Sequence, residues 1–235
     1  MTAKKKILIG LSAIVAVAAI VAASVAGTVA YLAASSSVTN VFTVGNIAIH
    51  MDESAVNPNG TLLDGGATRR DTNTYNLVPD GEYVKDPTIH VQEGSEAAYL
   101  FITVKNDIAP IAANDVDKPT IAAQLAANGW AKIAQVPAGN VYVYVGAGNV
   151  AAGGELDINS PKSAVEFSQG GQSYQLFEKF YIGHDVDCTP YGAAKIIING
   201  FAIQDTGLET VKDAWDAIVA KFDYLNLTEG GGSGL

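Results

Sequence analysis

Short β-prone runs separated by turn-forming residues recur along most of the chain, and this pattern restricts the fold more than any other feature. The clearest run, residues 97–106, alternates Leu100, Ile102 and Val104 with aromatic and hydroxyl side chains. Both of its faces are apolar enough for a central strand that is covered on both sides. Turn signals such as Asp80-Gly81 separate the runs, as is typical of β-sandwiches. The pattern predicts an all-β fold, a jelly-roll-like β-sandwich.

Other β-prone segments fit the same architecture. Residues 39–51 are rich in β-branched side chains and predict one long strand or two short ones. Residues 82–90 predict another strand, which Pro87 confines to a sheet edge or a strand start. Residues 52–73 contain several turn formers and predict a polar loop or a short hairpin. Further strands are expected at 130–136 and 141–145, as a hairpin, and at 165–167, 174–182 and 194–204.

One short helix is expected as an insertion between strands, over residues 117–128. Asp117 is a suitable N-cap, and Pro119 is acceptable in a first helical turn. Gly129 is suitable at the position just after the helix, where a left-handed backbone is common.

A second helix is expected near the C-terminus. Thr206 with Glu209, and Thr210 with Asp213, both have the spacing of a capping box. Apolar residues then recur at helical spacing on one face, which predicts a core-packing helix: Val211, Ala214, Trp215, Ile218 and Phe222.

The N-terminus has the form of an export signal. Met1–Lys6 is basic, an uncharged run follows from Ile7 to Ala34, and Thr28-Val29-Ala30 suits cleavage between Ala30 and Tyr31. Cleavage after Ala26 and retention as a membrane anchor remain alternatives, because the run is long enough to span a bilayer. The remainder is expected outside the cell in either case. The expected division is a signal helix at 1–30, an N-terminal β segment at 31–50, a jelly-roll-like domain at 51–227 and a glycine-rich tail at 228–235.

Charge and cysteine content exclude several classes of function. The chain has 14 Lys and Arg against 24 Asp and Glu, a net charge of −10. Removal of the signal would also remove Lys4, Lys5 and Lys6 and leave the domain more acidic. Such a domain lacks the basic patch that nucleic acid or anionic membranes require, so a membrane contact is expected only through an uncleaved signal. Cys188 is the single cysteine, and no intramolecular disulfide is possible.

The residues give little support for an enzyme. The three histidines are His50, His90 and His184, and no HExxH motif occurs. His184 and Asp187 are weak metal candidates in a segment without zinc-ligand spacing. The pair Asp52-Glu53 lacks the pattern of a calcium loop, and we expect a solvated acidic loop there. We predict neither a catalytic residue nor a cofactor.

Three stretches together resemble the TasA/camelysin family of proteins exported by Gram-positive bacteria. Each is weak alone, but their order along the chain is fairly specific, and residues 107–173 carry little of the likeness. The stretches are residues 27–47, with Gly27-Thr28-Val29-Ala30-Tyr31 and Val38-Thr39-Asn40-Val41-Phe42; residues 83–104, with Tyr83-Val84-Lys85-Asp86-Pro87; and residues 201–215, with Phe201-Ala202-Ile203-Gln204 and Ala214-Trp215.

This resemblance implies a secreted jelly-roll protein of biofilm matrix fibres, processed by a SipW-type signal peptidase. It implies self-assembly in which the freed N-terminal segment completes the sheet of the next subunit as a donor strand, with other matrix proteins as possible partners. The candidate donor residues are Val38, Val41, Phe42 and Val44. The alternative is that this segment pairs within its own subunit. Two other functions stay open: a metal-dependent endopeptidase, as the camelysin name suggests, and a surface adhesin that does not polymerise.

Overall fold

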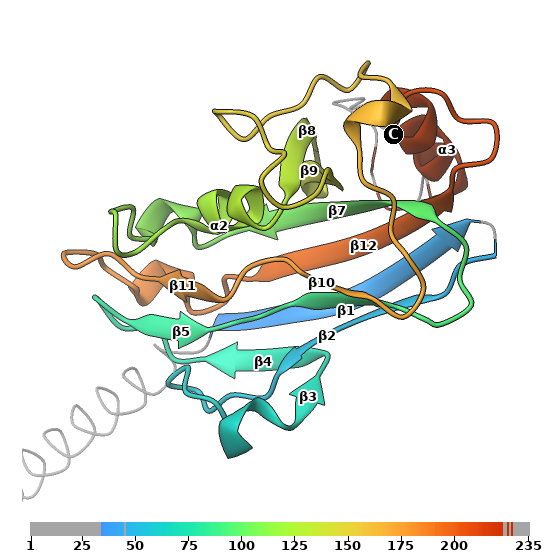
Figure 1. Ribbon diagram of the computed structural model, residues 1–235. Helices are drawn as coiled ribbons and strands as arrows, with labels where there is room; N and C mark the ends of the chain where they lie inside the picture. The colour runs from blue at the N-terminus through green and yellow to red at the C-terminus, as the bar shows by residue number, and fades with distance from the viewer. Residues whose placement is uncertain (1–33, 45, 223–224, 226, 228–235) are drawn as a thin grey trace, which may run out of the picture.

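A six-stranded sheet forms the centre of the molecule (Figure 1). The computed structural model describes residues 34–44, 46–222, 225 and 227, and for 34–44 it describes the backbone alone. The strand order in this sheet is β4 (Thr72–Tyr75), β1 (Ala34–Val44), β12 (Ile196–Gln204), β7 (Ala98–Asn106), β9 (Gly139–Tyr144) and β8 (Trp130–Val136).

Two smaller sheets complete the β-structure. One has the order β10 (Ser173–Gln175), β6 (Thr88–Val91), β2 (Ile49–Ser54) and β3 (Arg69–Arg70), and the other pairs β11 (Lys179–Tyr181) with β5 (Glu82–Val84). The helices are α2 (Ile121–Ala127) and α3 (Val211–Lys221), with short 3-10 turns η1 (Asp64–Gly66), η2 (Ala109–Ile111), η3 (Lys162–Ala164) and η4 (Thr189–Tyr191).

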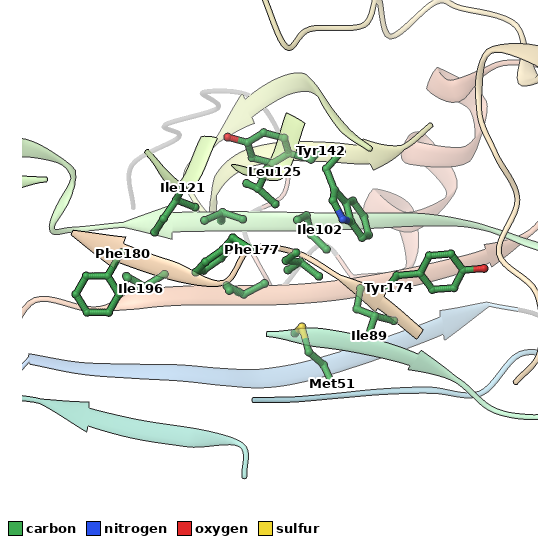
Figure 2. Packing of buried hydrophobic residues seen from close by; sticks show 14 of the residues in the cluster. Met51, Ile89, Ile102, Ile121, Leu125, Tyr142, Tyr174, Phe177, Phe180 and Ile196 are labelled. Carbon is green, nitrogen blue, oxygen red and sulfur yellow. The ribbon is translucent and has the colours of Figure 1, made fainter. Parts of the chain in front are cut away.

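Strand β7 is buried on both faces, as its alternating sequence predicts. Leu100, Ile102 and Val104 belong to a core shared with the smaller sheets and α2, whereas Tyr99 and Phe101 belong to a second core on the opposite face. Met51 of β2 and Ile89 of β6 belong to the same core as Ile102 of β7 and the α2 residues Ile121 and Leu125 (Figure 2). The described chain is therefore a β-sandwich with a second apolar layer outside its larger sheet.

Helix α3 forms that second layer, and its sequence signals are confirmed. Thr210 is the N-cap, and its hydroxyl accepts from the Asp213 N–H while the Asp213 carboxylate accepts from the Thr210 N–H. Thr206 does not cap the helix. Every residue of the predicted apolar stripe is buried, and Trp215 packs against Phe101 and Phe201 of the sheet.

Helix α2 begins later than the sequence predicted. Thr120, not Asp117, is its N-cap, because the Thr120 hydroxyl accepts from the Ala123 N–H at 3.2 Å. The Asp117 N–H instead donates to Asp115 Oδ1 in a preceding turn. Gly129 follows the C-cap with φ +89°, as predicted.

Several predicted strands have different limits in the structure. Residues 39–51 form two strands, of which β1 begins earlier, at Ala34. Pro87 divides residues 82–90 into β5 and β6, because proline cannot donate to a strand ladder. Residues 165–167 form no strand, and 174–182 divide into β10 and β11. The hairpin of β8 and β9 and the last strand, β12, form as predicted, although β9 begins two residues earlier and β12 two residues later than expected.

The predicted signal at 1–30, the cleavage site at Ala30 and Tyr31, and the tail at 228–235 lie outside the described residues. Among the residues that are described, no helix has the length and apolar character needed to cross a membrane.

Candidate functional site

Strand β1 lies between β12 and β4, in a position that we call the β1 slot (Figure 1). It runs parallel to β12, with a bulge between Val38 and Asn40, and its first four residues run antiparallel to β4. The candidate donor segment therefore pairs within its own chain here. Its residues have the following partners on β12: Val38 with Ile198, Val41 with Gly200, Phe42 with Phe201, and Val44 with Ile203.

The β12 side of the β1 slot is apolar on both faces. Ile198 and Ala202 belong to the core between the sheets, and Phe201 and Ile203 belong to the core beneath α3. Without β1, the edge of β12 would present unpaired backbone groups between these apolar side chains, which makes an open edge prone to pair with another strand. Pairing with β1 makes β12 an interior strand.

A polar cluster lies on the β2–β6 pair. His50 and His90 are cross-strand partners, and their rings stack with centroids 4.6 Å apart. His90 Nε2 lies 3.0 Å from Asp52 Oδ1, and His50 Nε2 lies 3.8 Å from Asp52 Oδ2. The Ser173 hydroxyl lies 2.7 Å from His90 Nδ1, so the other ring nitrogen of His90 faces the carboxylate.

His50, His90 and Asp52 offer ligand atoms that transition metals bind: two imidazole nitrogens and a carboxylate oxygen, all within 4.8 Å of one another. Arg69 opposes such a role, because its guanidinium donates to Asp52 Oδ1 and also to Asp86 Oδ2. Burial acts to raise the pKa of Asp52, but hydrogen bonds from Arg69 and His90 outweigh it and hold that pKa below its ordinary value. The arrangement is a salt-bridged network across the sheet, and we assign no metal to it.

A second polar cluster is fully buried. Glu53 of β2, Asn73 of β4 and Lys85, which follows β5, have exposed fractions of 0%, 2% and 0%. Lys85 Nζ donates to Glu53 Oε2, and Asn73 Nδ2 donates to Glu53 Oε1 at 2.9 Å. The prediction of a solvated acidic loop at Asp52-Glu53 is therefore wrong, because the two residues lie in a strand and point to opposite faces.

Burial dominates the electrostatics of this cluster. It lowers the pKa of Lys85 below its ordinary value, although the Glu53 carboxylate acts to raise it. A lysine with a lowered pKa loses its proton more readily than a lysine at the surface. In a buried site, a neighbouring group has to accept that proton. Glu53 is positioned to accept it.

The metal candidates from the sequence are not brought together. His184 is exposed, and its ring nitrogens lie 3.9 Å from Asp80 Oδ2 and 3.7 Å from Asp185 Oδ1. Asp187 Oδ1 accepts from the Thr189 N–H at 2.9 Å, at the start of η4. Cys188 is buried, and burial raises the pKa of its thiol.

A hollow of about 590 Å³ opens between η2, the start of α2 and the β8–β9 hairpin. Lys105, Tyr142 and Tyr181 are among its lining residues, which include no carboxylate. The lining of this hollow therefore holds no carboxylate that could act as a general acid or a general base.

Sequence reasoning missed both polar clusters. One signal was present for the buried cluster: Tyr83 and Lys85 are two residues apart in a β-prone run, so they share a strand face. A lysine in phase with a buried tyrosine indicates an inward-pointing charge. The partners Glu53 and Asn73 could not have been identified in this way, because pairing between distant strands brings them there. No protein-family model, curated protein or solved structure matches this chain.

Proposed function

We propose that this chain is a secreted structural subunit, or an accessory protein, of an extracellular biofilm matrix or cell-surface fibre. In this proposal a signal peptidase cleaves near Ala30, and the freed N-terminal strand enters the β1 slot of the next subunit. The observation that carries the proposal is the position of β1: it begins a few residues after the expected cleavage site and fills an interior place in the sheet.

The direction of β1 supports exchange. It is parallel to β12, whereas every other pair of named strands in the described chain is antiparallel. Strands β12, β7, β9 and β8 pair with one another without β1, and a strand from another chain can make the same backbone hydrogen bonds to β12. We also propose that the strands have a jelly-roll arrangement, in which β1 is the strand that the neighbouring subunit supplies.

Exchange of this kind gives a filament. The slot and the donated strand are different surfaces, so each subunit gives to one neighbour and receives from another, and the contact does not close. Before cleavage the same segment continues into the signal and remains held at the membrane. Cleavage is then the step that permits assembly.

The test uses cysteines at paired positions of the β1 slot. Thr43 and Ala202 are Cα partners on β1 and β12, and neighbouring strands place Cα atoms within disulfide range. Thr43→Cys and Ala202→Cys are placed in separate mature chains, residues 31–235, each also carrying Cys188→Ala. The two proteins are mixed and incubated under oxidising conditions.

Exchange predicts a disulfide-linked heterodimer from the mixture, seen on a non-reducing gel and mapped to the two positions. A chain with both substitutions should give a disulfide ladder, and filaments should be visible by negative-stain microscopy. If the mixture forms no heterodimer while the double variant forms its disulfide inside single monomers, β1 stays in its own subunit and the proposal fails. Filaments from the unsubstituted chain should also resist chelator.

A further inference from the structure

The buried cluster holds an amine and a carboxamide on the two oxygens of one carboxylate. Lys85 Nζ donates to one oxygen of Glu53, and Asn73 Nδ2 donates to the other. These residues come from different strand regions, β2, β4 and the segment after β5, and all three are buried. A single carboxylate therefore bridges the Lys85 amine and the Asn73 side-chain amide.

The Asn73 carboxamide is oriented and polarised. Its Oδ1 accepts from the Val56 backbone N–H at 3.0 Å, and its Nδ2 also donates to the Ser54 carbonyl at 2.8 Å. If the amide were turned over, its oxygen would face two acceptors, the Glu53 carboxylate and the Ser54 carbonyl. The hydrogen-bond network therefore assigns the nitrogen and oxygen positions of the Asn73 amide. The Val56 N–H is placed where it would stabilise negative charge on Oδ1 if a nucleophile attacked Cγ.

The surroundings exclude water. Tyr75 and Tyr83 lie two residues from Asn73 and Lys85, on the same strand faces, and both pack against Phe180 with ring centroids 5.1 Å and 4.8 Å away. Such a site strengthens electrostatic interactions and favours the neutral form of an amine. The lowered pKa of Lys85 agrees with this environment.

We propose that Lys85 and Asn73 form an intramolecular isopeptide bond, with Glu53 as the catalytic proton carrier. The Lys85 ammonium gives a proton to Glu53, and the neutral Nζ attacks Asn73 Cγ to form a carbon–nitrogen bond. The proton that Glu53 holds passes to Nδ2, the second Nζ proton also passes to the leaving nitrogen, and the Cγ–Nδ2 bond breaks, so that the leaving group departs as ammonium and Glu53 is again a carboxylate. The step needs no oxidant and no cofactor, and its products are one amide and one ammonium ion.

The bond would join β4 to the segment after β5. Because β4 pairs with β1, the cross-link would hold one wall of the β1 slot in place. It would also give a covalent constraint to a chain whose single cysteine cannot form an internal disulfide. The bond needs only the contacts of the buried cluster, and it would form with or without strand exchange.

Peptide mapping by mass spectrometry of the purified chain tests the bond. Trypsin should cleave after Arg70 but not after an acylated Lys85, so one peptide, residues 71–105, should appear with the mass of one ammonia missing. A glutamate-specific protease should then cut after Glu82, Glu93 and Glu96, and residues 71–82 should stay joined to residues 83–93 because the isopeptide bond links them. Peptides 71–85 and 86–105 at full mass would overturn the proposal.

Three variants assign the roles. Glu53→Gln keeps the size of the side chain but cannot carry the proton, and peptides 71–85 and 86–105 should then appear unmodified. Asn73→Asp should give the same product as the wild type with loss of water instead of ammonia, so it tests the bond even if Glu53→Gln fails to fold. Lys179→Gln removes a partly buried lysine that is paired with Glu82 outside the cluster, and it should leave the cross-link intact.

Other outcomes contradict the assignment. Loss of ammonia with fragments that separate after cleavage at Glu82 would indicate a succinimide at Asn73. Loss of water in the wild type would indicate a bond to a carboxyl group. Full cross-linking in Glu53→Gln would remove Glu53 from the reaction.

Discussion

At the scale of single residues, β2 shows how adjacent acids acquire different roles. Asp52 and Glu53 are neighbours in sequence, yet Asp52 joins the network of Arg69 and His90 while Glu53 is fully buried with Lys85. Strand geometry alone causes the difference, since successive side chains point to opposite faces. Composition and motif cannot reveal it, because both residues contribute equally to the acidity of the chain.

The lowered pKa of Asp52 predicts a pH-dependent contribution to stability. A folded-state pKa below the ordinary value of 3.8 means that the folded chain favours the charged carboxylate. The contribution is present above that ordinary value and disappears as the pH falls through the folded-state pKa. Asp52→Asn should therefore lower the free energy of unfolding by about 1–2 kcal/mol at pH 7, with the difference vanishing in strong acid.

Urea unfolding at several pH values checks this prediction. The matched control is Asp71→Asn, an exposed aspartate in the turn before β4, which should change stability little. A difference between wild type and Asp52→Asn that is the same at every pH would show that the carboxylate charge is not responsible.

At the scale of elements, local signals determined where helices begin and end. Both helices have a threonine N-cap, and α3 adds a reciprocal capping box. For α3 the sequence offered two capping positions, Thr206 and Thr210, and only the second is used. Tertiary packing supports that choice, because a helix starting after Thr210 places Val211 and Trp215 against the sheet.

Replacement of the two threonines should separate these positions. Thr210→Ala removes a side-chain acceptor from the first turn of α3 and should cost about 1 kcal/mol of stability. Thr206→Ala removes no cap and should be close to neutral. Thermal unfolding followed by circular dichroism measures both, and equal losses for the two variants would contradict the capping geometry.

At the scale of the whole molecule, the six-stranded sheet is continuous only when a strand occupies the β1 slot. Seven residues of β1, in a ladder broken by one bulge, pair with β12 along most of its length. A chain without them would leave that length of backbone unpaired beside two apolar cores. The stability of the sandwich is thus coupled to the presence of a strand in the slot, whichever chain supplies it.

A strand supplied in trans measures this coupling. A chain beginning at Asn46 should have a lower melting temperature than the mature chain, and a synthetic peptide of residues 31–48 should bind it and raise that temperature. At a peptide concentration of 100 times its Kd, the gain is about 2.7 kcal/mol, which corresponds to roughly 5–10 °C for a domain of this size.

The control peptide carries Val41→Pro, which removes a backbone donor from the strand and should not restore stability. If the truncated chain melts at the same temperature as the mature chain, then β1 does not complete the sheet. That result would also weaken the proposed assembly, because exchange depends on a slot that requires a strand.

The sequence by itself determined the β-rich class, the central strand at 97–106, the hairpin of β8 and β9, and the apolar face of α3. These features depend on alternation, turns and caps, which act between residues close together in the chain. Pro87 also acts locally, although it divided a segment that alternation alone predicted as one strand.

Only the tertiary structure decided which distant residues meet. Placing β1 between β12 and β4 pairs Val41 with Gly200, and the contact of Glu53 with Asn73 and Lys85 requires three separate strand regions to pack together. Such contacts depend on register between strands far apart in the chain, and no local pattern specifies that register. The features on which the proposed assembly and the proposed cross-link depend belong to this second group.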